Sequence, residues 1–125
     1  MAAMVARWNS CPFCVGAHSA VAVHGLAAEV VRATLDDYST APISEPLRAT
    51  LRFLEKMTCE PDELDEDDAR AALASGVTRT QLTDAAAVGA LFNIITRYAS
   101  ALDFALPSDH EFARSSGMLL KRGYA

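Results

Sequence analysis

Two cysteines and one histidine share a short segment of the chain, residues 11–18, which reads Cys-Pro-Phe-Cys-Val-Gly-Ala-His. On an α-helix, where successive residues rotate by about 100°, Cys11, Cys14 and His18 fall within about 60° of one another. A thiol pair that can close a disulfide therefore lies beside a group that can accept a proton. This pattern indicates thiol redox chemistry, which needs a thiolate and a partner sulfur.

The residues alone leave open which sulfur reacts first. Cys11 is expected at or near the N-terminus of a helix, where the helix dipole favours a thiolate. His18 follows Cys14 by one helical turn and is able to take the Cys14 proton, directly or through water. The dipole therefore favours Cys11 as the nucleophile, and the neighbouring base favours Cys14.

Two other interpretations of this segment also stay open. A single C-x-x-C is often half of a zinc site, but His24 lies about 120° or more from the stripe of Cys11, Cys14 and His18. Only the tertiary fold would bring His110 close enough to be the fourth ligand. The other interpretation is a structural Cys/His cluster. We expect no bound metal, and we expect Trp8 and Phe13 to be packing residues.

Composition sets the class of protein. The chain has 125 residues, 51% of them hydrophobic and only 7% aromatic, which favours one all-α domain spanning residues 1–125. The net charge of −5 argues against nucleic acid as a partner. The acidic run 60–68 is typical of a solvated loop leading into a helix, and Cys59 before it is expected to be an ordinary thiol.

No apolar run reaches the roughly 18 residues of a membrane span, and the first residues lack a signal-peptide pattern. We therefore expect a cytoplasmic protein with no membrane partner.

Hydrophobic spacing and capping residues predict helices along the whole chain and no strand. The fold class expected is an all-α, single-domain bundle of about six helices. The segments predicted to be helical are 1–8, Pro12 to about Gly25 as its C-cap, Leu26 to about Asp37, a helix from Glu45, Asp65–Ser75, Thr78 or Thr80 to about Phe104, and Ser108 to about Arg122.

The sequence around the cysteines also resembles a known signature. Residues 7–18 are similar to the pattern R-x-N-G/S-C-x-Y/F-C-x-x-x-H of the alkylhydroperoxidase D-like, carboxymuconolactone decarboxylase superfamily. Residues 47–58, residues 75–77 with Asp84, and residues 91–102 resemble segments of its peroxidase-related branch. The resemblance extends from about Met1 to Pro107.

This resemblance implies a helical fold that assembles as a homo-oligomer: a dimer, trimer or hexamer. It implies that Cys14 attacks a small organic hydroperoxide, that Cys11 resolves the product as a disulfide, and that His18 belongs to the proton relay. A thiol or a lipoyl-bearing protein would then reduce the disulfide. No metal or flavin cofactor is implied.

Two departures from the family pattern lower the peroxidase activity expected. The characterised enzymes carry a glutamate about twelve residues ahead of the first cysteine, a position that falls before Met1. Either the relay carboxylate is missing or the chain is an N-terminally shortened form. In addition, Phe13 occupies a position where those enzymes can carry a histidine. The alternatives are a carboxymuconolactone decarboxylase-like lyase, which does not need two redox thiols, and a catalytically weak helical oligomer with a binding or structural role.

The longest predicted helix carries a run without charge, residues 85–92. A helix that is apolar nearly all round must be buried on every side, which one small domain rarely achieves with its own chain. We therefore expect this helix or the motif helix to lie near a subunit contact. The alternative is that it is the central helix of a monomeric bundle.

Overall fold

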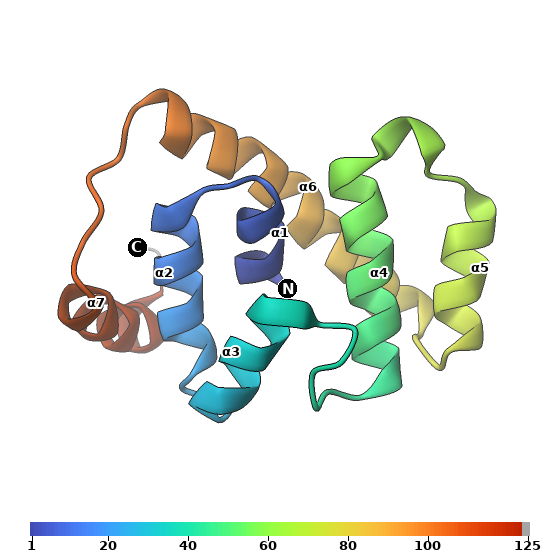
Figure 1. The fold of residues 1–125 in the computed structure, drawn as a ribbon, viewed down its shortest axis with the longest axis horizontal. Helices are drawn as coiled ribbons and strands as arrows, with labels where there is room; N and C mark the ends of the chain where they lie inside the picture. The colour runs from blue at the N-terminus through green and yellow to red at the C-terminus, as the bar shows by residue number, and fades with distance from the viewer. Residues whose placement is uncertain (124–125) are drawn as a thin grey trace.

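The computed structural model describes residues 1–123 and is helical, with no strand among those residues (Figure 1). It confirms the all-α prediction, with seven α-helices instead of about six and one short 3₁₀ helix. The elements are α1 (Ala2–Trp8), α2 (Pro12–Ala22), α3 (Ala28–Asp37), α4 (Glu45–Cys59), η1 (Pro61–Glu63), α5 (Glu66–Ala74), α6 (Arg79–Ala101) and α7 (Asp109–Arg122).

Three of the helices begin with reciprocal capping boxes. The side chains of Asp65, Thr78 and Ser108 each accept a hydrogen bond from a backbone N–H in the first turn of α5, α6 or α7. In each case the side chain of the third helical residue accepts a hydrogen bond from the backbone N–H of the cap residue. These bonds satisfy N–H groups that have no partner inside the helix. Thr78, and not Thr80, is therefore the cap of the longest helix.

Three predicted boundaries are wrong by a few residues. Helix α2 ends at Ala22, and Gly25 lies in a following turn whose N–H bonds to the Ala22 carbonyl, so it is not the C-cap. Helix α3 begins two residues later than expected. Helix α6 ends at Ala101 instead of continuing to Phe104, because Asp103 adopts a left-handed conformation with φ of 48°, which breaks the helix.

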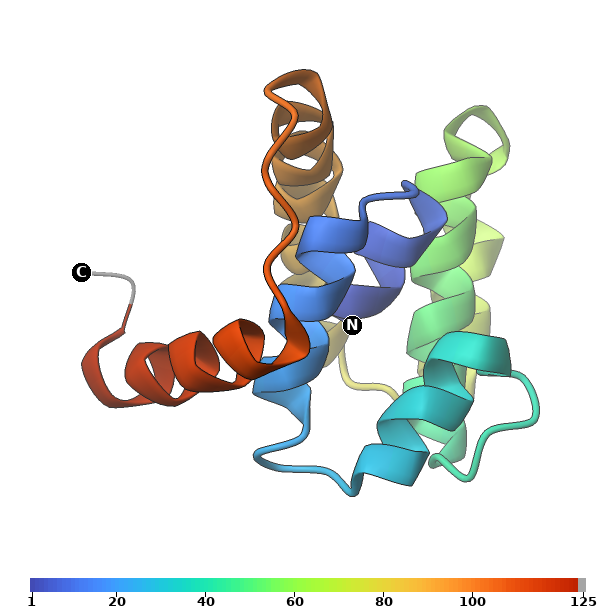
Figure 2. The same cartoon turned by 60° about the vertical axis from the view of Figure 1, so that its left-hand side comes forward.

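Helix α1 lies at the centre of the molecule, between α2 and α4 and against α6 (Figures 1 and 2). Its residues Val5 and Ala6 are completely buried. Val5 packs with Leu54 of α4 and Ala85 of α6 in one core cluster. Within residues 1–123, no helix is long and apolar enough to cross a membrane.

An arginine organises the loop between α3 and α4. The Arg48 guanidinium donates hydrogen bonds to four backbone carbonyls of this loop, those of Tyr38, Ser39, Ala41 and Ile43. Its side chain is only 18% exposed. A planar group with five donors suits such a set of acceptors, and the loop is thereby held against the first turn of α4.

Helix α7 lies across α2 and projects from the body of the molecule (Figure 2). The close approach depends on Gly16, because a Cβ atom there would lie 2.4 Å from Cε2 of Phe112. A second contact joins Nε2 of His24 to Oγ of Ser116 at 3.0 Å. His24 thus lies just beyond the end of α2, at a contact between helices.

We predict that Gly16→Ala destabilises the protein despite the better helix propensity of alanine. Propensity would add about 1 kcal/mol to the free energy of unfolding, whereas overpacking against Phe112 costs about 1–3 kcal/mol or more. Urea unfolding monitored by circular dichroism measures the difference. Gly117→Ala in α7 is the matched control: its Cβ would meet nothing within 4 Å, so it should stabilise. Equal effects of the two substitutions would contradict the proposed contact.

Candidate functional site

Cys11 and Cys14 lie side by side at the start of α2. Cys11 is the N-cap residue and Pro12 opens the helix. The preceding turn is sharp because Ser10 adopts a positive φ of 54°. Both sulfurs are free thiols, and both residues are only 2% exposed. They form a core cluster with Ala6 of α1 and Ala99 of α6.

This burial controls the chemistry of the thiols. It raises the pKa of Cys14 to about 12, and a side-chain hydrogen bond and charge repulsion with Cys11 add to the effect. A thiolate loses its hydration in such surroundings, whereas a thiol does not. Cys14 is therefore protonated at neutral pH in this arrangement, so its attack on a substrate requires a base.

His18 is the titratable group nearest to Cys14 along α2, one helical turn further on. Its ring packs edge-on against Phe92 of α6, with ring centroids 4.5 Å apart. Burial lowers the pKa of His18, which leaves the imidazole neutral and able to accept a proton at pH 7. No hydrogen bond joins the ring to Cys14 within residues 1–123. The structure places the imidazole of His18 one helical turn from the Cys14 thiol.

A chain of polar side chains anchors the turn that leads to Cys11. The Asn9 side-chain amide donates to the Val5 carbonyl at 3.0 Å and to Oδ1 of Asn93 at 2.7 Å. Asn93 in turn donates to Oγ1 of Thr58 at 3.3 Å. These bonds tie α1, α4 and α6 together at the base of the turn. Asn9 and Asn93 both lie in the segments that carried the family resemblance, but only the fold shows that they bond to each other.

A cavity of about 230 Å³ opens beside Cys11. Its walls include Phe13 from α2 and Phe104 and Leu106 from the segment after α6, and the two phenyl rings meet edge-on at 5.3 Å. Phe13 is a packing residue, as predicted, and it also lines this cavity. Sequence reasoning missed Phe104 and Leu106 as site residues because it extended the helix through Phe104 and gave no role to the segment beyond. Helix α6 instead ends at Ala101, before the left-handed Asp103, and the fold places the segment beyond it at the cavity.

The remaining histidines do not join the thiol pair. His24 contacts α7, and His110 is an exposed residue in the first turn of that helix. In the described part of the chain, no group of three or more His, Cys, Asp and Glu side chains is arranged to hold a metal ion. Cys59 is exposed at the end of α4, as expected of an ordinary thiol.

Comparison with solved structures shows which proteins this chain resembles. The chain matches an uncharacterized peroxidase-related protein from Silicibacter sp. TM1040, with a TM-score of 0.78 and 28% identity over 90% of the chain. It also matches an uncharacterized peroxidase-related protein from Ralstonia eutropha JMP134, described as an alkylhydroperoxidase AhpD core, with a TM-score of 0.76 and 28% identity over 89% of the chain. This similarity in fold and sequence supports the resemblance to the alkylhydroperoxidase D-like, peroxidase-related superfamily. It spans 58% and 59% of the lengths of these two proteins. No family model and no curated protein matches the sequence significantly.

We predict that Cys14 reacts slowly with iodoacetamide in the folded protein. The raised pKa reduces its thiolate fraction at pH 8 by about a thousandfold relative to an ordinary cysteine, and burial limits access further. Mass spectrometry of the peptides should show Cys59 modified first, and Cys14 modified at least about 10³-fold more slowly than in the urea-unfolded chain. Equal rates in folded and unfolded protein would contradict the described burial.

Proposed function

We propose that this protein is a thiol-dependent peroxidase that reduces small organic hydroperoxides through Cys11 and Cys14. The observation that carries the proposal is a pair of free, adjacent, buried thiols on one helix beside a cavity, in a peroxidase-related fold. A structural role for two thiols at this spacing would not require the cavity beside Cys11.

In the proposed reaction, His18 takes the Cys14 proton and the thiolate attacks the terminal oxygen of the hydroperoxide. The S–O bond forms as the O–O bond breaks, and the alkoxide leaves as the alcohol after taking a proton, so that Cys14 becomes a sulfenic acid. The Cys11 thiol then attacks the Cys14 sulfur, water leaves, and a disulfide remains. A dithiol reductant, either a small thiol or a lipoyl-bearing protein in a reducing compartment, returns two electrons and two protons.

The cavity lies against Cys11 and indicates the side from which a reactant would reach the thiols. Cys11 contributes to the cavity wall, whereas Cys14, further along α2, does not. An incoming reductant would therefore attack the disulfide at Cys11. The apolar rings of Phe13 and Phe104 favour a substrate with a hydrocarbon group over hydrogen peroxide.

A specific observation supports one alternative, a catalytically weak helical oligomer with a binding or structural role. The raised pKa of Cys14 and the lack of a hydrogen bond to His18 within residues 1–123 both oppose thiolate formation. Counting free thiols before and after addition of cumene hydroperoxide separates the two functions: the peroxidase loses two thiols per chain, and the weak oligomer loses none.

Variants of the three site residues test the assigned roles. Cys14→Ser should abolish hydroperoxide consumption, whereas Cys11→Ser should allow one oxidation that stops at a sulfenate on Cys14. His18→Ala should slow the first step by roughly 10²-fold or more, and His110→Ala is the matched control. The rates follow from hydroperoxide consumption, and mass spectrometry of the 10–18 peptide locates the oxidation. The reverse pattern for the two cysteines would assign the attack to Cys11.

We also propose that the protein assembles as a homo-oligomer through one face of α6. Leu91, Ile94, Tyr98 and Leu102 follow one another at helical spacing and are 58%, 68%, 64% and 55% exposed. This exposed face supports assembly over the alternative, a central helix wrapped by its own chain in a monomeric bundle. A contiguous exposed apolar stripe of this kind is typical of a subunit contact.

Light scattering at micromolar concentration should accordingly give a mass of at least twice the chain mass of 13.4 kDa. Ile94→Glu places a charge at the centre of the face and should shift the mass to that of the monomer. Ser115→Glu adds the same charge to an exposed position on α7 and should leave the mass unchanged. A monomeric wild-type protein would refute the assembly.

A further inference from the structure

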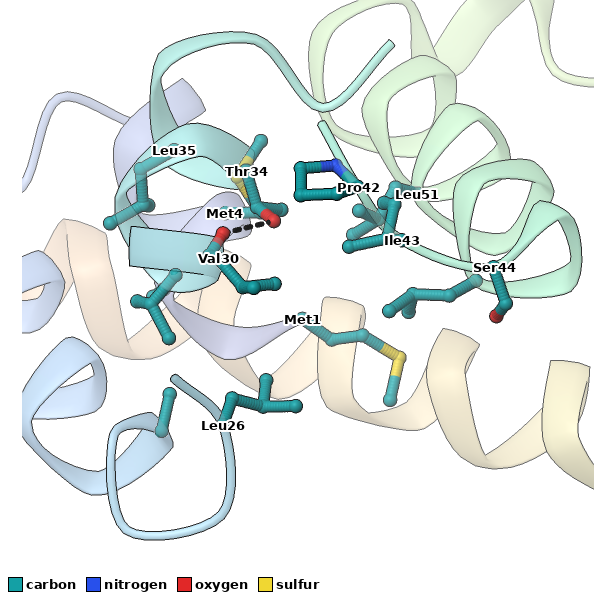
Figure 3. Close-up of a pocket in the computed structure, with 14 residues that line it drawn as sticks. Met1, Met4, Leu26, Val30, Thr34, Leu35, Pro42, Ile43, Ser44 and Leu51 are labelled. Carbon is teal, nitrogen blue, oxygen red and sulfur yellow. Dashed lines mark hydrogen bonds between the residues drawn. The ribbon is translucent and has the colours of Figure 1, made fainter. Parts of the chain in front are cut away.

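A second, larger pocket lies on the other side of α1 from the thiols. It has a volume of about 310 Å³ and is enclosed by α1, the turn after α2, α3, the loop before α4, and α4 itself (Figure 3). Met1 and Met4 enter it from α1, Leu26 from the turn, Val30 from α3, and Ile43 from the loop. The volume is in the range of sites for small ligands.

The side chains that line the pocket are mostly apolar. None of them is charged, and only those of Thr34 and Ser44 are polar. Burial lowers the pKa of the Met1 α-amino group, which favours its uncharged form. The Thr34 hydroxyl donates its hydrogen to the Val30 carbonyl at 2.8 Å (Figure 3), and Ser44 is exposed at the edge. A charged group placed inside would lose hydration with nothing to replace it, whereas a hydrocarbon group gains from burial there.

The walls are formed without any ligand. The loop that carries Ile43 is held by Arg48, whose guanidinium bonds to the carbonyls of Ala41 at 3.1 Å and Ile43 at 3.2 Å. Val31 of α3 and Leu51 of α4, which also line the pocket, are buried. The concavity therefore belongs to the folded chain and needs no rearrangement to receive a small molecule.

The pocket is separate from the thiol site. Neither Cys11 nor Cys14 lines it, and α1 stands between the two: Ala3 and Met4 face the pocket, whereas Ala6 packs against the sulfurs. We propose that this pocket is a binding site for the aliphatic chain of a small, uncharged, diffusible molecule. The proposal is independent of the peroxidase function, because it rests on the lining of the pocket and not on the thiols.

Titration of the full chain with 1-octanol, followed by ¹⁵N–¹H correlation spectra, tests this site. The expected result is saturable shifts of the Val30, Val31 and Ile43 amides, with little change near Phe104. Ala22→Leu and Thr34→Leu fill the pocket from α2 and α3 and should each weaken binding by at least tenfold. Ala28→Leu, at an exposed position of α3 outside the lining, should bind as the wild type does.

Two outcomes would overturn the proposal. One is the absence of saturable shifts up to the solubility limit of octanol. The other is a shift map centred on the exposed face of α6 or on the Cys11 cavity. Because the filling variants lie on different helices, a folding defect in one, detected by circular dichroism, leaves the other to decide. Cumene hydroperoxide consumption, measured in parallel, reports on the thiols separately.

Discussion

The burial of four consecutive residues of α1, Ala3 to Ala6, is the constraint on which the rest of this structure depends. A helix of seven residues is too short to be stable on its own, so its stability must come from packing against α2, α3, α4 and α6. Its last turn leads directly into the sharp turn at Ser10 and then into Cys11. The position of Cys11 and Cys14 is therefore set by a helix that carries none of the candidate site residues.

Small side chains make this packing possible. Ala6 and Ala99 approach the two sulfurs closely. At Gly89 on α6, an added Cβ atom would lie 2.9 Å from Cδ2 of Leu54. Helices that approach so closely leave little room for water around Cys11 and Cys14. The raised pKa of Cys14 is thus a consequence of the same packing that holds the bundle together.

Burial has opposite effects on the two halves of the proposed cycle. It opposes the thiolate, which is charged, and so slows the attack on a hydroperoxide. It does not oppose the disulfide, which is uncharged and needs no hydration. A neutral His18 is consistent with these surroundings, because the imidazole can accept a proton only in its neutral form. In the proposed cycle, the cavity at Cys11 is the side from which the pair would be reached.

The sequence by itself determined the features that arise from local interactions. Capping residues and apolar spacing depend on neighbours within a few residues, so the helices could be predicted closely. The spacing of Cys11, Cys14 and His18 likewise sufficed to propose them as a candidate site. Tertiary structure decided the rest. Asn9 bonds to Asn93, which lies far away in the sequence, and Arg48 bonds to carbonyls of the loop before α4. Phe104, which lies beyond the end of α6, forms part of the cavity wall. The pKa of Cys14 and the apolar pocket beside α1 belong to the same class, because burial depends on how whole helices pack and no single segment encodes it.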